Sequence, residues 1–451
     1  MALADYLLAS GDATLLDQPL PFHAEPGDAH PPVPVREHVV RALAVVARRT
    51  IAGTRLAAYG HGDWNDALQP ADPALREHLC SAWTVTLHHR MLRSLAAAWR
   101  RLGDAAPAPV AGGGAEAVAG ACVEAIAEAE AATALHAEAS RFTADANAVL
   151  ADFQRLLVVD GVVTGYALFE PGAPVDYLLH PRDARTGISL SALPMVHAIL
   201  DELFTPAQAT AHAQLLAGVL QGPDGLRLFD RPLRYRSGPM ALFQRGESAS
   251  YFGREIGLMY MHAHLRWAEA LAHLGRADEF LHALQLANPI GLESLVPQAA
   301  PRQRNCYYSS SDAAFADRNE AWQHYDRLHR GEVALEGGWR IYSSGAGIAY
   351  RLVLQRLLGL TARHDQLGID PVLCPALDGL VVRLPLYGHP VEVHYRVGAQ
   401  GHGPLAVALG DEPLALTPGH NRYRMPGVWV AAEPLRQRLA AGATRLDITL
   451  G

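Results

Sequence analysis

The chain has 451 residues, enough for two or three domains, and its 50% hydrophobic and 19% charged residues are typical of a globular protein. A formal net charge of −8 and the lack of any basic run argue against binding to the phosphate backbone of nucleic acids. All 38 basic residues are Arg, so mechanisms that need a Schiff-base lysine or a P-loop lysine are excluded.

Cysteines and apolar runs indicate the compartment. The four cysteines are far apart and form no C-x-x-C pair, which argues against a disulfide framework and a cysteine-rich zinc site and suits a reducing compartment. The N-terminal residues include Asp5 and no basic residue, unlike a secretory signal. No apolar run approaches the ~20 residues of a membrane span. We therefore expect a cytoplasmic protein with no membrane span.

Apolar residues at helical spacing predict helices over the first two thirds of the chain. The longest stripe lies within residues 76–101 and recurs every four residues (Leu79, Trp83, Leu87, Met91, Leu95 and Trp99). Similar spacing predicts helices over residues 35–48, 191–203, 256–274 and 348–360, and composition favours another over 124–150. The Ala- and Gly-rich stretch 105–121 is predicted to be a surface loop.

Short runs rich in β-branched residues predict strands in two places. Residues 158–169 indicate a hairpin between helices. Beyond Asp365, the runs VVRLPLYG, VEVHYRVG, LAVALG and VWVA are separated by turn residues and indicate a β domain. The expected arrangement is therefore a set of antiparallel helix pairs at 1–362, followed by a small β domain at 363–451.

The polar segment YGHGDWND, residues 59–66, is the densest group of candidate site residues. Asp63, Trp64, Asn65 and Asp66 supply two carboxylates, an indole and an amide. This set suits a sugar ring, because its axial hydrogens stack on an indole while its hydroxyls bond to Asp and Asn. One carboxyl can also donate the proton that a leaving glycosidic oxygen needs. The alternative is that the two carboxylates cap a helix, but Pro70 follows closely.

A second segment, WRIYSSGAG at residues 339–347, precedes an apolar helix. Ser343, Ser344 and Gly345 would stand at its N-terminus, where free N–H groups and the helix dipole favour an anion. It is not a dinucleotide fingerprint, because Tyr350 occupies the position of the third glycine. The alternative is ordinary serine capping.

Two more polar segments remain. Residues 244–266 contain several side chains that could line a cleft (Glu247, Tyr251, Arg254, His262 and His264). The H-x-H pair does not predict a metal, because residues i and i+2 face apart on a helix and no HExxH pattern accompanies them. Residues 301–318 are rich in Ser, Tyr and Arg but lack a nucleophile motif, so a solvated loop is expected. No metal and no cofactor are predicted.

In this order, the segments GHGDWNDALQP, FQRGESASYFGREIGLMYMHAHL, QRNCYYSSSDAAFADR and GEVALEGGWRIYSSGAGI resemble glycoside hydrolase family 94, the inverting phosphorylases of β-linked glucosides. The likeness is greatest to the 1,2-β-oligoglucan phosphorylases and to the C-terminal phosphorylase-like region of cyclic β-1,2-glucan synthases, and it extends over essentially the whole chain. The resemblance implies a mainly α fold: an (α/α)6 barrel followed by a small β-sandwich-type C-terminal domain.

The resemblance also implies roles for individual residues. Asp66 matches the general acid, and Trp64 matches a contact to the donor sugar. The phosphate-contacting residues match His264, with His262 as the alternative, and the segment around Ser343 and Ser344. The remaining residues implied to bind substrate or phosphate are Asp63, Asn65, Glu247, Tyr251 and Gly345.

Members of this family carry a large N-terminal β-sandwich, a linker and the first barrel helices before the W-N-D element. Here 62 residues precede Asp63. We therefore expect a C-terminal piece whose barrel lacks its first helices. Such a piece would expose apolar helix faces, so we expect a homodimer or association with the missing N-terminal portion.

The resulting prediction is inverting phosphorolysis of β-1,2-linked gluco-oligosaccharides to α-D-glucose 1-phosphate, with a β-glucan oligosaccharide and inorganic phosphate as substrates. One catalytic carboxyl suffices, because phosphate attacks the anomeric carbon directly. The alternatives are a cellobiose-type disaccharide phosphorylase and a non-catalytic fragment or subunit that binds glucan. A plain hydrolase fits less well, because residues 343–347 resemble an anion site.

Overall fold

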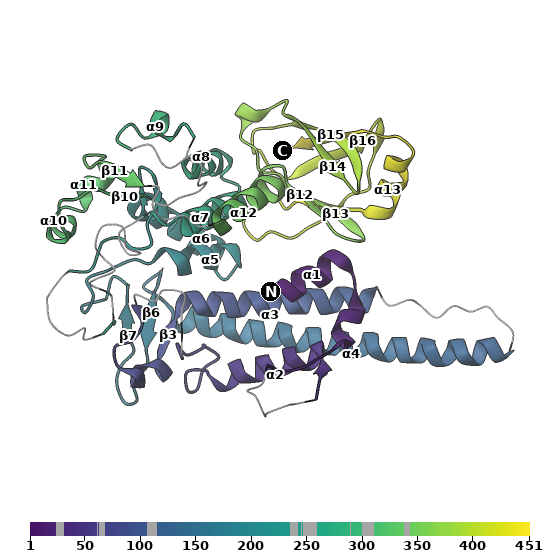
Figure 1. Ribbon diagram of the computed structural model, residues 1–451, viewed down its shortest axis with the longest axis horizontal. Helices are drawn as coiled ribbons and strands as arrows, with labels where there is room; N and C mark the ends of the chain where they lie inside the picture. Colours follow the sequence, from purple (N-terminus) through teal and green to yellow (C-terminus); the bar gives the residue numbers. More distant parts are fainter. Residues whose placement is uncertain are drawn as a thin grey trace. The chain divides into compact units, whose positions relative to one another are not determined.

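The computed structural model describes residues 1–451 except 24–30, 61, 63–67, 106–114, 235–241, 245, 247–258, 289, 300–310 and 338–342. The chain divides into two units (Figure 1). Unit 1 comprises Met1–Ala58 and Leu87–Phe153, and unit 2 comprises Tyr59–Thr86 and Gln154–Gly451. The domain boundary predicted at residue 362 lies inside unit 2 and stays a prediction.

Unit 1 is built from helices. It contains α1 (Ala2–Ser10), α2 (Val35–Arg48) and most of α3 (Ala82–Asp104) and α4 (Ala115–Leu156), beside the short strands β1 (Pro19–Leu20) and β2 (Val33–Pro34). The bounds of α2 are those predicted from its spacing. Trp99 of α3 packs edge-on against Phe142 of α4, with ring centroids 5.8 Å apart. Its indole Nε1 donates a hydrogen bond to Glu138 Oε2 at 2.6 Å, which joins the two helices.

Two helix starts differ from the prediction. The long helix expected from residue 76 begins at Ala82, because Leu79–Ser81 form strand β3, which pairs with β6 (Tyr166–Leu168). Leu79 is buried in either conformation, so its place in the apolar stripe did not distinguish helix from strand. Helix α4 begins at Ala115, inside the stretch predicted as a loop, because the helix propensity of Ala outweighs that of the neighbouring Gly.

The first part of unit 2 combines small sheets with helices. The predicted hairpin is present as β4 (Val158–Val159) and β5 (Val162–Val163), and β3, β6 and β7 (Asp176–Leu178) form a three-stranded sheet. Helix α7 (Met261–His273) contacts three other helices and is buried along most of its length. Those neighbours are α5 (Ala192–Leu200), α8 (Ala277–Ala287) and α12 (Ser343–Leu352). Helix α7 thus forms the centre on which α5, α8 and α12 pack.

Shorter elements surround this centre. They are α6 (Pro206–Leu215), β8 (Gln221–Gly222), β9 (Gly225–Leu226), α9 (Leu292–Leu295), β10 (Ser311–Ala313), α10 (Arg318–Gln323), α11 (Asp326–His329) and β11 (Leu335–Gly337). Strands β10 and β11 pair in antiparallel fashion over a small core that includes Leu328 and Leu335. The end of the predicted loop 301–318 is therefore a strand and the start of a helix.

The C-terminal region is β structure, as predicted. One sheet has the order β12-β13-β19-β18 and the other β14-β15-β20-β16-β17. The strands are β12 (Leu360–Ala362), β13 (Gln366–Ile369), β14 (Val381–Leu386), β15 (His389–Arg396), β16 (Pro404–Leu409), β17 (Glu412–Pro413), β18 (Thr417–Pro418), β19 (Val428–Ala431) and β20 (Arg445–Leu450). Both sheets and α13 (Ala432–Ala440) contribute side chains to one hydrophobic core. The described chain is therefore largely helical with a C-terminal β region.

Helix α12 connects the helical part of unit 2 to this β region. It starts at Ser343, five residues before the predicted start, and continues as a π-helical turn over Val353–Leu357. Leu354, Leu357 and Leu358 in and after that turn pack against the core of the β region. The C-terminal end of the helix is therefore anchored in the β region, while its N-terminus lies against α7.

Candidate active site

All of the predicted sugar-binding residues and the predicted general acid lie outside the described residues. These are Asp63, Trp64, Asn65, Asp66, Glu247 and Tyr251. The side chain of Ser343 is likewise not described, although its backbone begins α12. His264, Ser344 and Gly345, which were predicted to bind phosphate, are described.

The chain segments next to Asp66 and Glu247 pair with each other. Gln244 donates its backbone N–H to the carbonyl of Gln69 at 2.8 Å, and Ala71 donates to the carbonyl of Leu242 at 2.9 Å. Gln69 stands three positions after Asp66, and Gln244 stands three positions before Glu247. The structure therefore joins the two segments predicted to bind sugar, although they are separated by more than 170 positions in the chain.

Helices α7 and α12 bring a serine and a histidine into contact. The hydroxyl Oγ of Ser344, in the first turn of α12, lies 2.8 Å from Nε2 of His262, in the first turn of α7. Ser344 is exposed and His262 is half-buried. Burial, and then the charge of Arg266, lower the pKa of His262 below its usual value, which favours a neutral imidazole beside the serine.

The second histidine of the H-x-H pair points elsewhere. His264 is fully buried, its Nδ1 accepts the N–H of Leu226 at 3.2 Å, and its Nε2 lies 2.8 Å from the carbonyl of Ala283. A neutral ring protonated on Nε2 satisfies both contacts. Both ring nitrogens are thus engaged by the backbone of β9 and α8. Of the two histidines, His262 and not His264 contacts the N-terminus of α12.

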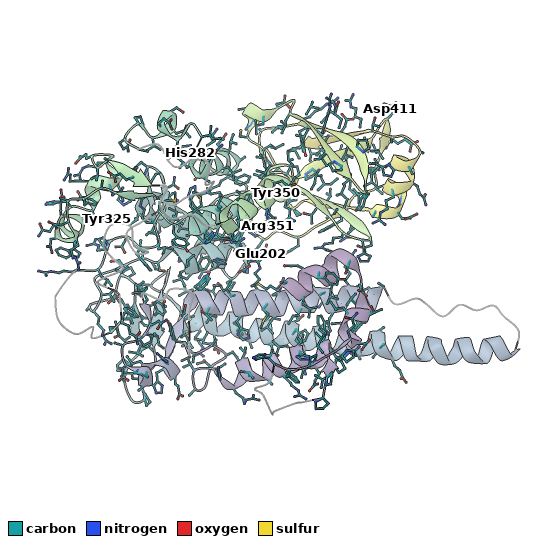
Figure 2. The ribbon with its side chains drawn as sticks, viewed as in Figure 1. Glu202, His282, Tyr325, Tyr350, Arg351 and Asp411 are labelled. Carbon is teal, nitrogen blue, oxygen red and sulfur yellow. The ribbon has the colours of Figure 1, made fainter. Side chains whose placement is uncertain are left out.

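One buried carboxylate gathers three guanidinium groups between α7 and α12. The carboxylate of Glu269, on α7, accepts two hydrogen bonds from Arg351 of α12, at 2.6 and 2.9 Å, and one from Arg266 at 2.7 Å. Arg356, in the turn that follows α12, lies 3.3 Å from the same carboxylate. Burial alone raises the pKa of Glu269, but the three arginines hold it well below its usual value. Arg351 is labelled on α12 in Figure 2.

The loop before β19 ties the C-terminal β region to the end of α7. Arg424 donates two hydrogen bonds to Asp370, at 2.8 and 2.9 Å, and a third to the carbonyl of Ala272 at 3.1 Å. Asn421 donates to the carbonyl of His273 at 3.0 Å. Because α12 is anchored in the same β region, this loop helps to fix α7 and α12 together.

Sequence reasoning missed the four charged residues of this cluster, Arg266, Glu269, Arg351 and Arg356. The signal was weak, because an Arg three positions before a Glu on a helix is common on solvated faces. Among the described residues, no three His, Cys, Asp or Glu side chains gather to hold a metal ion. No helix in the described part of the chain is long and apolar enough to cross a membrane.

Comparison with known proteins relates this geometry to a family. Residues 359–448 match the profile of the glycoside phosphorylase C-terminal domain. Over 425 residues, 94% of the chain, the sequence is 33% identical to a 1,2-β-oligoglucan phosphorylase from Listeria innocua serovar 6a. The match covers 35% of that protein, so the chain spans about a third of its relative's length. The predicted resemblance is confirmed: residues 359–448 match the glycoside phosphorylase C-terminal domain, and nearly the whole chain is similar to part of a 1,2-β-oligoglucan phosphorylase.

Proposed function

We propose that this chain forms part of the catalytic region of an inverting phosphorylase that cleaves β-1,2-linked gluco-oligosaccharides with inorganic phosphate. The observation that carries the proposal is the contact between Ser344 and His262 at the N-terminus of α12, in a chain similar to a 1,2-β-oligoglucan phosphorylase. The similarity suggests the reaction, and the contact at a helix N-terminus supports the proposed phosphate site.

The proposed phosphate site consists of the backbone N–H groups at the start of α12, the hydroxyl of Ser344 and the neutral imidazole of His262. The first N–H groups of α12 have no partner within the helix, and the helix dipole adds partial positive charge at that end. The hydroxyl of Ser344 can donate to a phosphate oxygen or to His262. A neutral imidazole offers one N–H donor and one acceptor, so His262 can orient the serine or a protonated phosphate oxygen.

The proposed reaction needs one acid and one nucleophile. Asp66 donates its proton to the interglycosidic oxygen as the bond from that oxygen to the anomeric carbon breaks. A phosphate oxygen forms the new bond to the anomeric carbon from the opposite face, which inverts its configuration. The products are α-D-glucose 1-phosphate and a glucan that is one unit shorter. Trp64, Asp63 and Asn65 would hold the donor sugar.

The proposal extends to the sugar side and to the fold. Glu247 and Tyr251 would bind sugar close to the backbone pairing of residues 69–71 with 242–244, with Tyr251 toward the acceptor. The packing of α5, α8 and α12 on α7 supports assigning the helical part of unit 2 to an (α/α)6 barrel. The two C-terminal sheets that share one core support a β-sandwich-type domain that begins near residue 363.

The test is release of glucose 1-phosphate from sophorose and longer β-1,2-glucans by the folded chain, with and without inorganic phosphate. We expect release only with phosphate, and Asp66→Asn should reduce it at least 100-fold. Asp224→Asn is the matched control, because it also replaces an acidic residue by its amide but lies in another segment of the chain. Phosphate-independent release of glucose would contradict the proposal and indicate a hydrolase. Faster turnover of cellobiose than of sophorose would instead indicate a cellobiose-type disaccharide phosphorylase.

A second candidate follows from the match to 35% of the relative. In this candidate, the chain binds β-1,2-glucan as a subunit without turning it over by itself. Calorimetry with sophorose distinguishes the two, because saturable binding by a folded but inactive chain favours the subunit.

A further inference from the structure

Helices α7 and α12 touch at two levels with the same spacing. Ser344 contacts His262 at the first level, and Arg351 contacts Glu269 at the second. Each second residue stands seven positions after the first on its own helix. Seven residues are about two helical turns, or roughly 10.5 Å, so the helices run side by side in the same direction. The contact of Arg351 with Glu269 (the lower contact) and the contact of Ser344 with His262 (the upper contact) therefore share one register of α12 on α7.

The lower contact is built to be rigid. Arg351 uses two nitrogens on the two carboxylate oxygens of Glu269, at 2.9 and 2.6 Å, and a paired fork of this kind fixes both distance and orientation. The Glu269 side chain is only 4% exposed, so little water competes for it. Arg266 and Arg356 occupy its remaining acceptor positions. Sliding α12 along α7 would have to distort or break this fork, and the short serine could not extend to keep its own contact with His262.

We propose that Glu269 is a positioning residue for phosphate: through Arg351 it sets the register of α12 on α7 and so holds Ser344 against His262. This inference rests on the proposed function, because it takes the N-terminus of α12 as the phosphate site. Glu269 itself lies two turns from that site and would not touch phosphate.

Two substitutions separate positioning from simple charge. Glu269→Gln removes a negative charge, so a purely electrostatic effect would tighten phosphate binding. Arg351→Met removes a positive charge, so the same effect would weaken it. Loss of register weakens binding in both variants. Arg351→Lys keeps the charge and loses the paired fork, and its effect therefore reports geometry.

The experiment measures the Kd of inorganic phosphate by isothermal titration calorimetry with the full chain. We expect Glu269→Gln and Arg351→Met each to raise the Kd at least 5-fold, and Arg351→Lys to raise it 2- to 5-fold. The Kd of sophorose should change less than 2-fold. Hydrogen exchange should become at least 5-fold faster in residues 343–352 of both strong variants.

Asp224→Asn is the matched control. Asp224 is a fully buried carboxylate paired with Arg227, so its loss reproduces the general cost of breaking a buried ion pair without touching α12. Its phosphate Kd should stay within 2-fold of the unsubstituted chain. If Glu269→Gln does not fold, the two substitutions of the partly exposed Arg351 carry the test.

The outcomes distinguish this inference from the proposed function. Tighter phosphate binding by Glu269→Gln, or an unchanged Kd in Arg351→Met, would overturn the positioning role even in an active enzyme. A chain that binds phosphate with the expected losses but releases no glucose 1-phosphate would overturn the proposed function alone. A chain to which phosphate does not bind would overturn both.

Discussion

The same substitution should affect different properties at His262 and His264 of α7: phosphate binding at one and stability at the other. In His264→Leu, the buried N–H of Leu226 loses its partner, and the carbonyl of Ala283, inside α8, loses the second of its two hydrogen bonds. In His262→Leu, the structure loses a contact to an exposed serine. We therefore expect His264→Leu to lower the free energy of unfolding and His262→Leu to weaken phosphate binding.

The magnitude follows from the hydrogen bonds. A buried donor left without a partner costs about 1–3 kcal/mol, and the loss of one further hydrogen bond costs about 0.5–1.5 kcal/mol, so the two contacts of His264 together are worth about 1.5–4.5 kcal/mol. Leucine recovers a part of this by burying apolar surface. The half-buried His262 contacts an exposed hydroxyl and packs edge-on against the ring of Tyr260, so its loss should cost about 1 kcal/mol of stability.

Urea unfolding followed by circular dichroism measures the first effect, and calorimetry with inorganic phosphate measures the second. We expect the phosphate Kd to rise at least 5-fold in His262→Leu. A His264→Leu chain that still folds should keep its Kd within 2-fold. The reasoning is refuted if His264→Leu keeps full stability and loses phosphate affinity while His262→Leu keeps that affinity.

Three more predictions concern stability. Burial raises the pKa of Glu202, but hydrogen bonds from His273 and the N–H of Arg422 lower it to about 2, against 4.5 for the free side chain. The ionised Glu202 therefore stabilises the folded chain above pH 4.5, and this stabilisation is lost as the pH falls toward 2. Glu202→Gln should remove about 1–2 kcal/mol of stability at pH 7, after allowance for solvent screening, and little at pH 2.5 in urea unfolding. Burial lowers the pKa of His212 to about 4, so between pH 6.5 and 4.5 only the unfolded chain binds the proton. The free energy of unfolding should therefore fall by about 2–3 kcal/mol as the pH is lowered from 6.5 to 4.5. His212→Asn should make the free energy of unfolding depend less on pH in this range, and an unchanged pH dependence would contradict the assignment to His212. Gly225 has φ +138°, and an added Cβ would lie 2.9 Å from His264 Nδ1. Gly225→Ala should therefore lower the free energy of unfolding, measured in urea, by about 1–3 kcal/mol. A decrease below about 0.5 kcal/mol would show that this turn tolerates a side chain.

Sequence spacing was sufficient where one local pattern admits one structure. Residues 35–48 form α2 with the predicted bounds, because a polar face and an apolar face at helical spacing suit no other element. Val158–Val163 form the predicted hairpin, because β-branched residues flank an Asp-Gly turn. Spacing was insufficient at Leu79, since a buried residue at the edge of an apolar stripe fits a strand equally well.

The sequence by itself determined which side chains are available for binding and catalysis. There is no lysine, residues 63–66 form a D-W-N-D cluster, and two serines precede an apolar helix whose N-terminus favours an anion. Only the tertiary structure decided which histidine meets Ser344. His262 and His264 are two positions apart, so they face different neighbours, and those neighbours come from distant segments. Ala283 and Leu226 hold His264 in the core, while α12 reaches His262. The same is true of Glu269, because its contact with Arg351 exists only when two helices that are remote in sequence pack side by side.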